Sequence, residues 1–263
     1  MNFPKVSVVI TTKNRKSELD RAIESVMFQN YENIEIIIVD DGSECDFYNY
    51  TLNKYSGKCM ILRNEISKGA CNARNKGIDA ATGVFIAGLD DDDEFTRDRI
   101  YTMVNEYRKY ENAPYINKPS LICSHAVNIN DDGSKIFEKE KPFIITKDMM
   151  LKTNFVGSQV LVKKSIIQSS GLFDENLVAS QDHDMWLRII EKHGPGIKLR
   201  SSLYICHDSK GISRVSSKKL MGLIQFYKKH KSKMNFWQKL FNVLRGVKMI
   251  ISQPSLLYSN FKL

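Results

Sequence analysis

The sequence is poor in the residues that mark several protein classes. Its 263 residues include five cysteines, none in a C-x-x-C pair, which argues against a disulfide framework or a zinc ribbon and favours a reducing cytosol. Glycine and proline together supply only 20 residues, which excludes a collagen-like chain. With 42% hydrophobic and 26% charged residues, the composition is that of a globular protein with one large domain, or one domain and an appendage.

Long hydrophobic runs are missing as well. No stretch reaches the roughly 18 apolar residues that a membrane-spanning helix needs. The first apolar run, Val6–Ile10, is shorter than the core of a signal peptide. We therefore expect a protein that is not secreted and is either soluble or bound to a membrane surface.

Acidic residues are absent from one end of the chain. Residues 209–263 contain no Asp or Glu but twelve Lys and Arg, so they carry a charge of +12 and residues 1–208 a charge of −3. Apolar residues recur there at helical spacing in two stripes, 220–227 and 237–251, interleaved with basic residues. Basic amphipathic helices favour an anionic membrane surface; the alternatives are helices packed on the rest of the protein or a nucleic-acid face. No recognisable nucleic-acid module accompanies the charge, so we expect no nucleic-acid partner.

Strand and helix patterns alternate through the first half of the sequence. Short runs rich in β-branched residues predict strands at 5–12, 34–39, 59–62 and 84–89. Apolar residues at helical spacing predict connecting helices at 17–27, 70–81 and 100–107. Ser17 is the expected N-cap of the first helix. Such alternation predicts a parallel sheet covered by helices.

The second half is patterned differently. Strands are expected at 121–128 and 160–162, and a helix at 184–191. No linker rich in Pro, Gly or Ser interrupts the chain. The boundary that we expect between a first domain, 1–210, and a basic helical extension, 211–263, therefore rests on charge alone.

Polar clusters follow three of the predicted strands. They are Thr11–Asn14, Asp40–Ser43 and the four consecutive carboxylates Asp90–Asp93. The carboxyl ends of parallel strands lie along one edge of a sheet, where α/β proteins bind ligands. Four adjacent carboxylates repel one another unless a cation neutralises them, and Mg²⁺ or Mn²⁺ prefers such oxygens while leaving room for substrate phosphate. Because neither a Walker A sequence nor G-x-G-x-x-G occurs, we expect bound phosphates to be held by metal.

An ordered set of motifs carries a family resemblance. The set comprises SVVITTKNR at 7–15, IVDDGS at 38–43, GACNARNKGI at 69–78, LDDDD at 89–93, GLFDE at 171–175 and DHDMWLR at 182–188. Together these segments resemble a family 2 glycosyltransferase. The resemblance implies a type A glycosyltransferase fold, which is a mostly parallel, Rossmann-like sheet flanked by helices, here followed by basic C-terminal helices. It also implies inverting, metal-dependent transfer from a nucleotide sugar.

The resemblance assigns residues to the nucleotide side of the site. By their places in the motifs, Thr11 and Asn14 are expected beside the nucleoside, and Asp41 is expected to hydrogen-bond the uracil. Arg74 is a further nucleotide-side residue or, alternatively, a surface charge of its helix.

The acidic strand end is matched to the sugar and the metal. The resemblance implies that Asp90 and Asp91 face the ribose and the donor sugar. Asp92 is expected to ligate the Mn²⁺ or Mg²⁺ that bridges the diphosphate. His207, within YICHD, resembles a late family element near the diphosphate, and it is expected to contact metal or phosphate unless it is a structural histidine.

Asp182 falls where the family has its catalytic base. Gln181 replaces the acidic residue that often precedes the base, which alters its electrostatic setting. A carboxylate can act here because the acceptor hydroxyl loses its proton only as the new bond forms. Asp184, two residues on, is better explained by its place near a helix N-terminus, where carboxylates are stabilised.

From these residues we expect an inverting hexosyltransferase on the cytosolic face of a bacterial inner membrane. It would move glucose or galactose from a UDP-sugar to a lipid-diphosphate-linked saccharide in O-antigen or capsule assembly, and this anionic, membrane-anchored acceptor would suit the basic tail. A different polysaccharide or a protein acceptor is the nearest alternative. A nucleotidyltransferase normally opens with a glycine- and arginine-rich phosphate loop, which is missing here. A non-catalytic membrane- or nucleic-acid-binding protein would leave the acidic strand ends unexplained.

Overall fold

Four apolar runs of the first half pair in parallel and form one side of the sheet in the structure, a computed structural model that describes residues 3–111, 118–208 and 218–252. The strands are β1 (Val6–Thr12), β2 (Ile34–Asp41), β3 (Met60–Asn64) and β4 (Phe85–Asp90). Thr11 of β1 lies opposite both Val39 of β2 and Asp90 of β4. This register places three polar strand ends side by side at one edge of the sheet.

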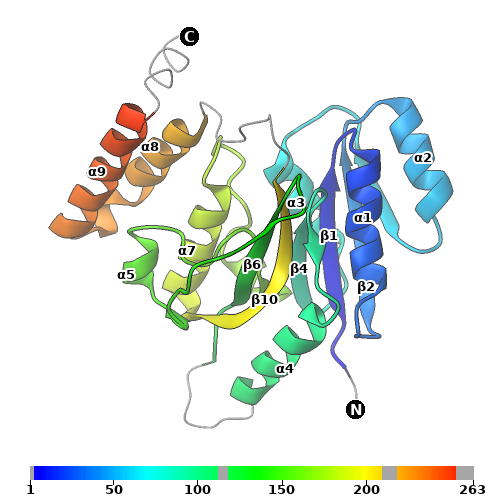
Figure 1. Ribbon diagram of the computed structural model, residues 1–263, viewed down its shortest axis with the longest axis horizontal. Coiled ribbons are helices and arrows are strands. Elements are labelled where there is room, and N and C mark those ends of the chain that lie inside the picture. Colours follow the sequence, from blue (N-terminus) through cyan, green and yellow to red (C-terminus); the bar gives the residue numbers. More distant parts are fainter. Residues whose placement is uncertain (1–2, 112–117, 209–217, 253–263) are drawn as a thin grey trace.

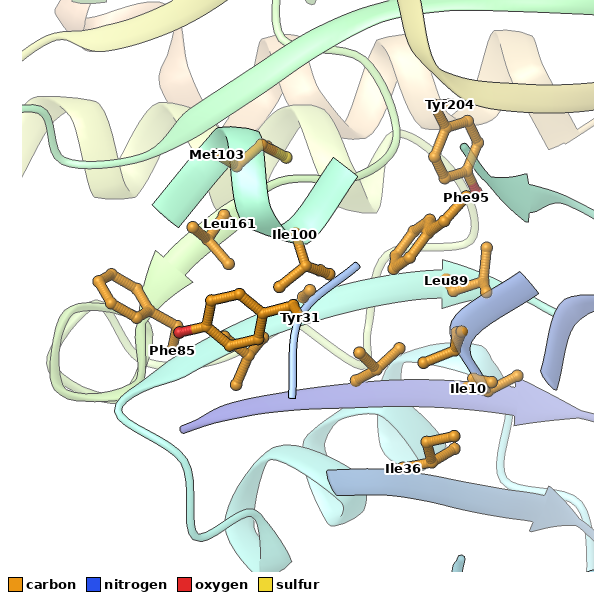
Figure 2. Packing of buried hydrophobic residues seen from close by; sticks show 14 of the residues in the cluster. Ile10, Tyr31, Ile36, Phe85, Leu89, Phe95, Ile100, Met103, Leu161 and Tyr204 are labelled. Carbon is orange, nitrogen blue, oxygen red and sulfur yellow. The ribbon is translucent and has the colours of Figure 1, made fainter. Parts of the chain in front are cut away.

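Helices connect these strands and cover both faces of the sheet (Figure 1). They are α1 (Lys16–Met27), α2 (Cys45–Tyr55), α3 (Ala70–Ala80) and α4 (Arg99–Glu111). Alternate residues of β1 enter two separate cores, because successive side chains of a strand point to opposite faces. Val8 and Ile10 pack in the core that contains α1 and α4, part of which Figure 2 shows, whereas Val9 packs in the core that contains α3.

The second half extends the sheet with shorter and partly antiparallel strands. They are β5 (Glu94–Phe95), β6 (Ile122–Asn130), β7 (Lys135–Phe137), β8 (Ile144–Ile145), β9 (Leu161–Lys163) and β10 (Gly196–Asp208). The intervening helices are α5 (Lys147–Met150), α6 (Lys164–Ser169) and α7 (Gln181–His193). Among the described residues the ten strands form one sheet in the order β3-β2-β1-β4-β9-β6-β10-β5, with β7 paired to β6 and β8 to β10. The sheet is therefore mixed but mostly parallel, as expected.

The predicted cap of the first helix is wrong. α1 begins at Lys16, with Arg15 at the cap position and no side-chain hydrogen bond from that residue to the helix. The hydroxyl of Ser17 instead donates a hydrogen bond to Glu18 Oε2, 3.0 Å away. The guanidinium of Arg15 instead points toward the carboxyl end of β4, where it contacts Asp91 and Asp92.

Two helices form from the basic, acid-free stretch. They are α8 (Lys218–His230) and α9 (Phe236–Ser252), joined by a 3-10 turn at Lys231–Lys233, and they lie together on the far side of α7 from the sheet centre (Figure 1). Phe226 of α8 is fully buried in the same core as Trp186 of α7. The boundary expected near residue 210 lies outside the described residues.

Candidate active site

A cleft of about 860 Å³ opens at the carboxyl ends of β1, β2 and β4. Eight of the nine predicted site residues line it: Thr11, Asp41, Arg74, Asp90, Asp91, Asp92, Asp182 and His207. The ninth, Asn14, is not among the lining residues. The cleft therefore gathers side chains from positions as far apart in the sequence as 11 and 207.

Asp91 and Asp92 share one arginine. Arg15 Nη1 lies 2.9 Å from Asp91 Oδ1 and 2.8 Å from Asp92 Oδ2. Asp91 Oδ2 also accepts a hydrogen bond from Thr12 Oγ1 at 2.9 Å. The cation that the sequence required for this cluster is thus supplied in part by the protein itself.

The two outer carboxylates of the acidic strand end are held from different elements. Arg74 of α3 donates a 2.8 Å hydrogen bond to Asp90 Oδ1. Tyr204 of β10 donates one of 2.9 Å to Asp93 Oδ2. These contacts fasten the end of β4 to both halves of the chain.

Two of these carboxyl groups resist ionisation. Burial raises the pKa of Asp91 to about 6, although the guanidinium of Arg15 pulls it downward. Burial also raises the pKa of Asp93 to about 7, and the neighbouring Asp90 and Asp92 add to the rise. The site therefore holds more carboxyl groups than its own arginines stabilise in the charged form.

Asp182 lies in the first turn of α7, on the wall of the same cleft. Its side chain is 30% exposed, and its Oδ1 atom is buried without a hydrogen-bond donor. Arg74 Nη1 is 3.8 Å from that oxygen. Burial raises the pKa of Asp182 to about 6, against the opposing effect of Arg74. This carboxyl group is accessible to a ligand and has an oxygen that can accept a proton.

Asp41 and Asn14, two of the residues expected on the nucleotide side, make different hydrogen bonds. Both carboxylate oxygens of Asp41 accept two hydrogen bonds each from the segment 64–69, at 2.7 to 2.9 Å. Asn14 ties two loops together, since its backbone N–H donates to Ser43 and its Oδ1 accepts from the backbone of Glu44. A uracil contact by Asp41 stays a prediction and would require one of its four hydrogen bonds to be exchanged.

His207 reaches the cleft from β10. Its Nε2 atom is 2.5 Å from Glu94 Oε1, and its backbone N–H lies 3.3 Å from Asp93 Oδ1. The ring nitrogen Nε2 is therefore engaged with Glu94. Contact of His207 with metal or phosphate stays a prediction, and in this geometry it would use Nδ1 or replace the Glu94 contact.

Sequence reasoning assigned no role to two residues that organise the cleft. Arg15 was part of a quoted motif, but nothing in one sequence indicates that it reaches two carboxylates more than 70 positions away. Tyr204 belongs to a strand with an irregular pattern, so its proximity to Asp93 had no sequence signal. Both contacts depend on the pairing of distant strands.

Comparison with known proteins identifies the family. Residues 7–157 match the family described as "Glycosyl transferase family 2". The chain belongs to this family. This family 2 glycosyltransferase is 32% identical over 238 residues to the putative colanic acid biosynthesis glycosyl transferase WcaA of Escherichia coli K12, covering 89% of this chain and 84% of the relative.

Two further comparisons bear on the site and the fold. The chain is 29% identical over 204 residues, 75% of its length and 73% of the relative, to an E. coli protein named UDP-Glc:alpha-D-GlcNAc-diphosphoundecaprenol beta-1,3-glucosyltransferase WfaP. The crystal structure of S. aureus TarS 1–349 in complex with UDP-GlcNAc superposes with a TM-score of 0.69 at 15% identity, over 95% of this chain and 73% of that one. That similarity confirms the expected glycosyltransferase fold.

The donor set of the cleft fits a hard divalent cation. Asp92 contributes carboxylate oxygen beside Asp91, and both already bind a positive group, the guanidinium of Arg15. Within the described ranges, no three His, Cys, Asp or Glu side chains are grouped so as to hold a metal ion by themselves. Metal binding by Asp92 stays a prediction; ions such as Mg²⁺ or Mn²⁺ are commonly bound by one or two carboxylates together with substrate phosphates.

No helix in the described part of the chain is both long enough and apolar enough to cross a bilayer.

Proposed function

We propose that this glycosyltransferase moves a hexose, glucose or galactose, from a UDP-sugar to a lipid-diphosphate-linked saccharide, with inversion at the anomeric carbon. The product would belong to a bacterial surface polysaccharide such as O-antigen or capsule. The observation that carries the proposal is the position of Asp182, whose buried Oδ1 atom accepts no hydrogen bond and lies in one cleft with the acidic end of β4.

Two relatives support the choice of substrates. The printed name of WfaP specifies UDP-glucose as donor and a GlcNAc-diphosphoundecaprenol acceptor. The structural neighbour TarS was crystallised with UDP-GlcNAc. A UDP-sugar donor is therefore the first to test on this chain, and a polyprenyl-diphosphate saccharide is the first acceptor.

The chemistry of the cleft suits a single displacement. Asp182 takes the proton of the acceptor hydroxyl while that oxygen forms a bond to the anomeric carbon. The bond from the anomeric carbon to the diphosphate oxygen breaks, and its electron pair leaves with UDP. Arg74, 2.8 Å from Asp90 and 3.8 Å from Asp182, holds positive charge between the donor-side and acceptor-side carboxylates.

Asp92 is the residue proposed to hold the Mg²⁺ or Mn²⁺ ion, with His207 as a second contact. When bound, such a cation stabilises the negative charge that develops on the departing diphosphate. Asp92→Ala should therefore abolish transfer, and EDTA should reversibly inactivate the wild type. Full activity after thorough removal of metal would contradict this assignment.

The orientation of α9 supports a membrane-associated acceptor. Its inward face is polar: Gln238 and Asn242 are 2% and 3% exposed and donate hydrogen bonds to backbone carbonyls of Asp148 and Leu151. Its outward face is apolar, with Trp237 71% and Ile251 73% exposed. An amphipathic helix that turns its apolar side outward is suited to lie in a membrane interface.

The charge around this apolar face indicates which membrane it would bind. Lys231, Lys239 and Lys248 are exposed on the turn before α9 and on α9 itself. Lysines beside an apolar helical face bind anionic lipid headgroups. An anionic surface, the cytosolic leaflet of a bacterial inner membrane, would place the enzyme on the same surface as its lipid-linked acceptor.

Turnover with defined substrates tests the proposal. Nucleotide sugars are offered one at a time with Mn²⁺ and a synthetic short-chain lipid-diphosphate GlcNAc acceptor, and released UDP and glycosylated acceptor are measured. UDP-glucose or UDP-galactose should support acceptor-dependent UDP release, and the new linkage should have the inverted configuration. A retained configuration, or transfer from a GDP-sugar alone, would overturn the proposal.

A further inference from the structure

The segment that leads into the proposed base is clamped between two helices. On one side, Asn75 of α3 exchanges two hydrogen bonds with the backbone of Phe173, both 2.9 Å. Asn72 and Asn75 also donate to the carboxylate of Glu175. On the other side lies α8, which contacts the same segment at successive turns of its own length.

Two residues of α8, Gly222 and Gln225, contact the backbone of this segment. Gln225 accepts a hydrogen bond from the backbone N–H of Val178 at 3.0 Å and donates one to the carbonyl of Asn176 at 3.2 Å. Gly222 lies directly against Ala179: a Cβ atom added to this glycine would be 2.6 Å from Ala179 Cβ and 2.8 Å from its carbonyl carbon. Only glycine allows α8 to approach the segment this closely.

The strongest contacts converge on Asp184, two residues beyond the base. This carboxylate is fully buried and is contacted by three basic side chains. Arg188 Nε of its own helix is 2.9 Å away, while Lys229 Nζ and His230 Nε2 of α8 are 2.9 and 2.8 Å away. A buried charge needs such partners, and removing one of them is costly. Two of the three partners here come from α8.

The residue between Asp182 and Asp184 is held by the same helix. The ring of His183 stacks on that of Phe226, with centroids 3.8 Å apart and planes 15° from parallel. His183 Nε2 is also 2.6 Å from the backbone carbonyl of Met150. The two residues that follow Asp182 are therefore both packed against α8.

Asp182 itself has little to fix its carboxyl group. Its Oδ1 atom accepts no hydrogen bond, and Arg74 is 3.8 Å away. The position of the carboxyl group therefore depends on the backbone of the first turn of α7. That turn follows Ser180, whose backbone is in the left-handed region (φ 58°).

We infer that α8 belongs to the catalytic unit, where Lys229 and His230 act through Asp184 as positioning residues that hold Asp182 at the acceptor hydroxyl. The inference rests on the proposed role of Asp182 as base. It makes the helix pair more than a membrane anchor: even with a short-chain acceptor in solution, turnover depends on contacts made by α8.

Kinetics of His230→Ala with a short-chain, water-soluble acceptor tests this role. Because a base displaced by about 1 Å can lose up to about 10²-fold, kcat should fall about 10- to 100-fold. KM for the UDP-sugar should change little, since none of the described residues that line the cleft belongs to α8. His230→Gln, which keeps a hydrogen-bond donor near Asp184, should recover part of the loss. Wild-type kcat in folded His230→Ala would overturn the inference.

A double variant separates positioning from general stability. In the Asp182→Asn background, His230→Ala should cause no further loss of kcat, because residues that act as a unit are non-additive. A full additional loss there would overturn the inference and leave the base assignment intact. Undiminished turnover in Asp182→Asn alone would overturn both.

Two further variants cover the case in which His230→Ala does not fold. Lys229→Gln removes a partly exposed partner of the same carboxylate, and Gly222→Ala pushes α8 from Ala179 without altering charge; each should lower kcat several-fold. Val26→Ala, a truncation in the core beneath α1, is the control matched for lost stability and should leave kcat unchanged below its melting temperature. If both α8 variants match this control, the inference fails.

Discussion

A carboxylate that accepts a proton works best when its pKa lies near the working pH. Burial raises the pKa of Asp182 to about 6, and only the ionised form can act as base. We expect kcat/KM to rise with pH through about 6 and then level off, and Asp182→Asn to lose about 10²-fold or more in turnover. UDP-sugar binding, measured by calorimetry, should survive the substitution. A pH profile that is flat on both sides of pH 6 would contradict the role of this group.

The raised pKa of Asp182 also predicts that its ionised carboxylate lowers the free energy of unfolding. Because the folded state holds the Asp182 proton more tightly than the unfolded chain, folding becomes less favourable as pH rises above the ordinary aspartate pKa, and the cost is complete above about pH 6. Asp182→Asn should therefore stabilise the protein by about 1–3 kcal/mol at pH 8. The gain should disappear below about pH 4, where both states are protonated. Urea unfolding at the two pH values measures the difference, and an equal gain at both would exclude this cause.

Single residues also show how far sequence reasoning reaches. Parallel strands end at the same edge of a sheet, which predicted that Thr11, Asp41 and Asp90 would lie close together. The family resemblance, not the strand pattern, placed Asp182 in the same site. It could not show that Arg15 bridges two of the carboxylates, or that Asn14 joins loops without lining the cleft. Those contacts depend on side-chain directions that periodicity does not encode.

At the scale of elements, α2 and β10 are the longest that the sequence analysis did not predict. α2 (CDFYNYTLNKY) is rich in aromatic, Asn and Thr residues, which are weak helix formers, and it buries only Phe47, Thr51 and Tyr55. β10 contains Ser201 and Ser202 in its middle, where its pairing with β6 shifts register. A bulge of this kind interrupts the alternation by which strands are recognised. Contacts with distant parts of the chain, rather than local sequence preference, therefore determine both elements.

The helix α9 carries its own prediction. Trp237 and Leu244 are 71% and 57% exposed, so changing both to Ser should leave the melting temperature nearly unchanged. If they insert into lipid, the double variant loses up to about 3 kcal/mol for each side chain, which amounts to a tenfold or greater loss of vesicle binding. Phe28→Ser, at an equally exposed aromatic residue just after the end of α1, is the control away from α9 and should bind vesicles normally. Unchanged binding by the α9 variant would exclude this face as the membrane contact.

At the scale of the whole molecule, the net positive charge is concentrated in the last 55 residues. Residues 209–263 carry +12 against −3 for the remainder, and each basic group near an anionic leaflet contributes about 1 kcal/mol. The protein should sediment with phosphatidylglycerol vesicles at low salt and be released at high salt. The Debye length is about 8 Å at physiological ionic strength and shortens as salt is added, which screens the attraction between the lysines and the lipid headgroups. Equal binding to neutral and anionic vesicles at every salt concentration would contradict an electrostatic anchor.

The lysines chosen to test this charge follow from the structure. Lys229 is paired with Asp174 and Asp184, and Lys233 with Glu191, so both have internal partners. The triple variant Lys231→Gln, Lys239→Gln, Lys248→Gln avoids those pairs. It should release from anionic vesicles at lower salt than the wild type while retaining turnover on a short-chain acceptor.

The polar inward face of α9 predicts an unusual pattern of sequence variation among relatives of this protein. On most surface helices, apolar residues are retained inward and polar residues vary outward. Here Gln238 and Asn242 donate hydrogen bonds to the carbonyls of Asp148 and Leu151, and an apolar replacement would remove these bonds, most severely at the buried Leu151. The outward positions require only bulk and hydrophobicity. Among close relatives that share this helix, the inward amides should therefore persist while the outward apolar residues exchange freely with one another.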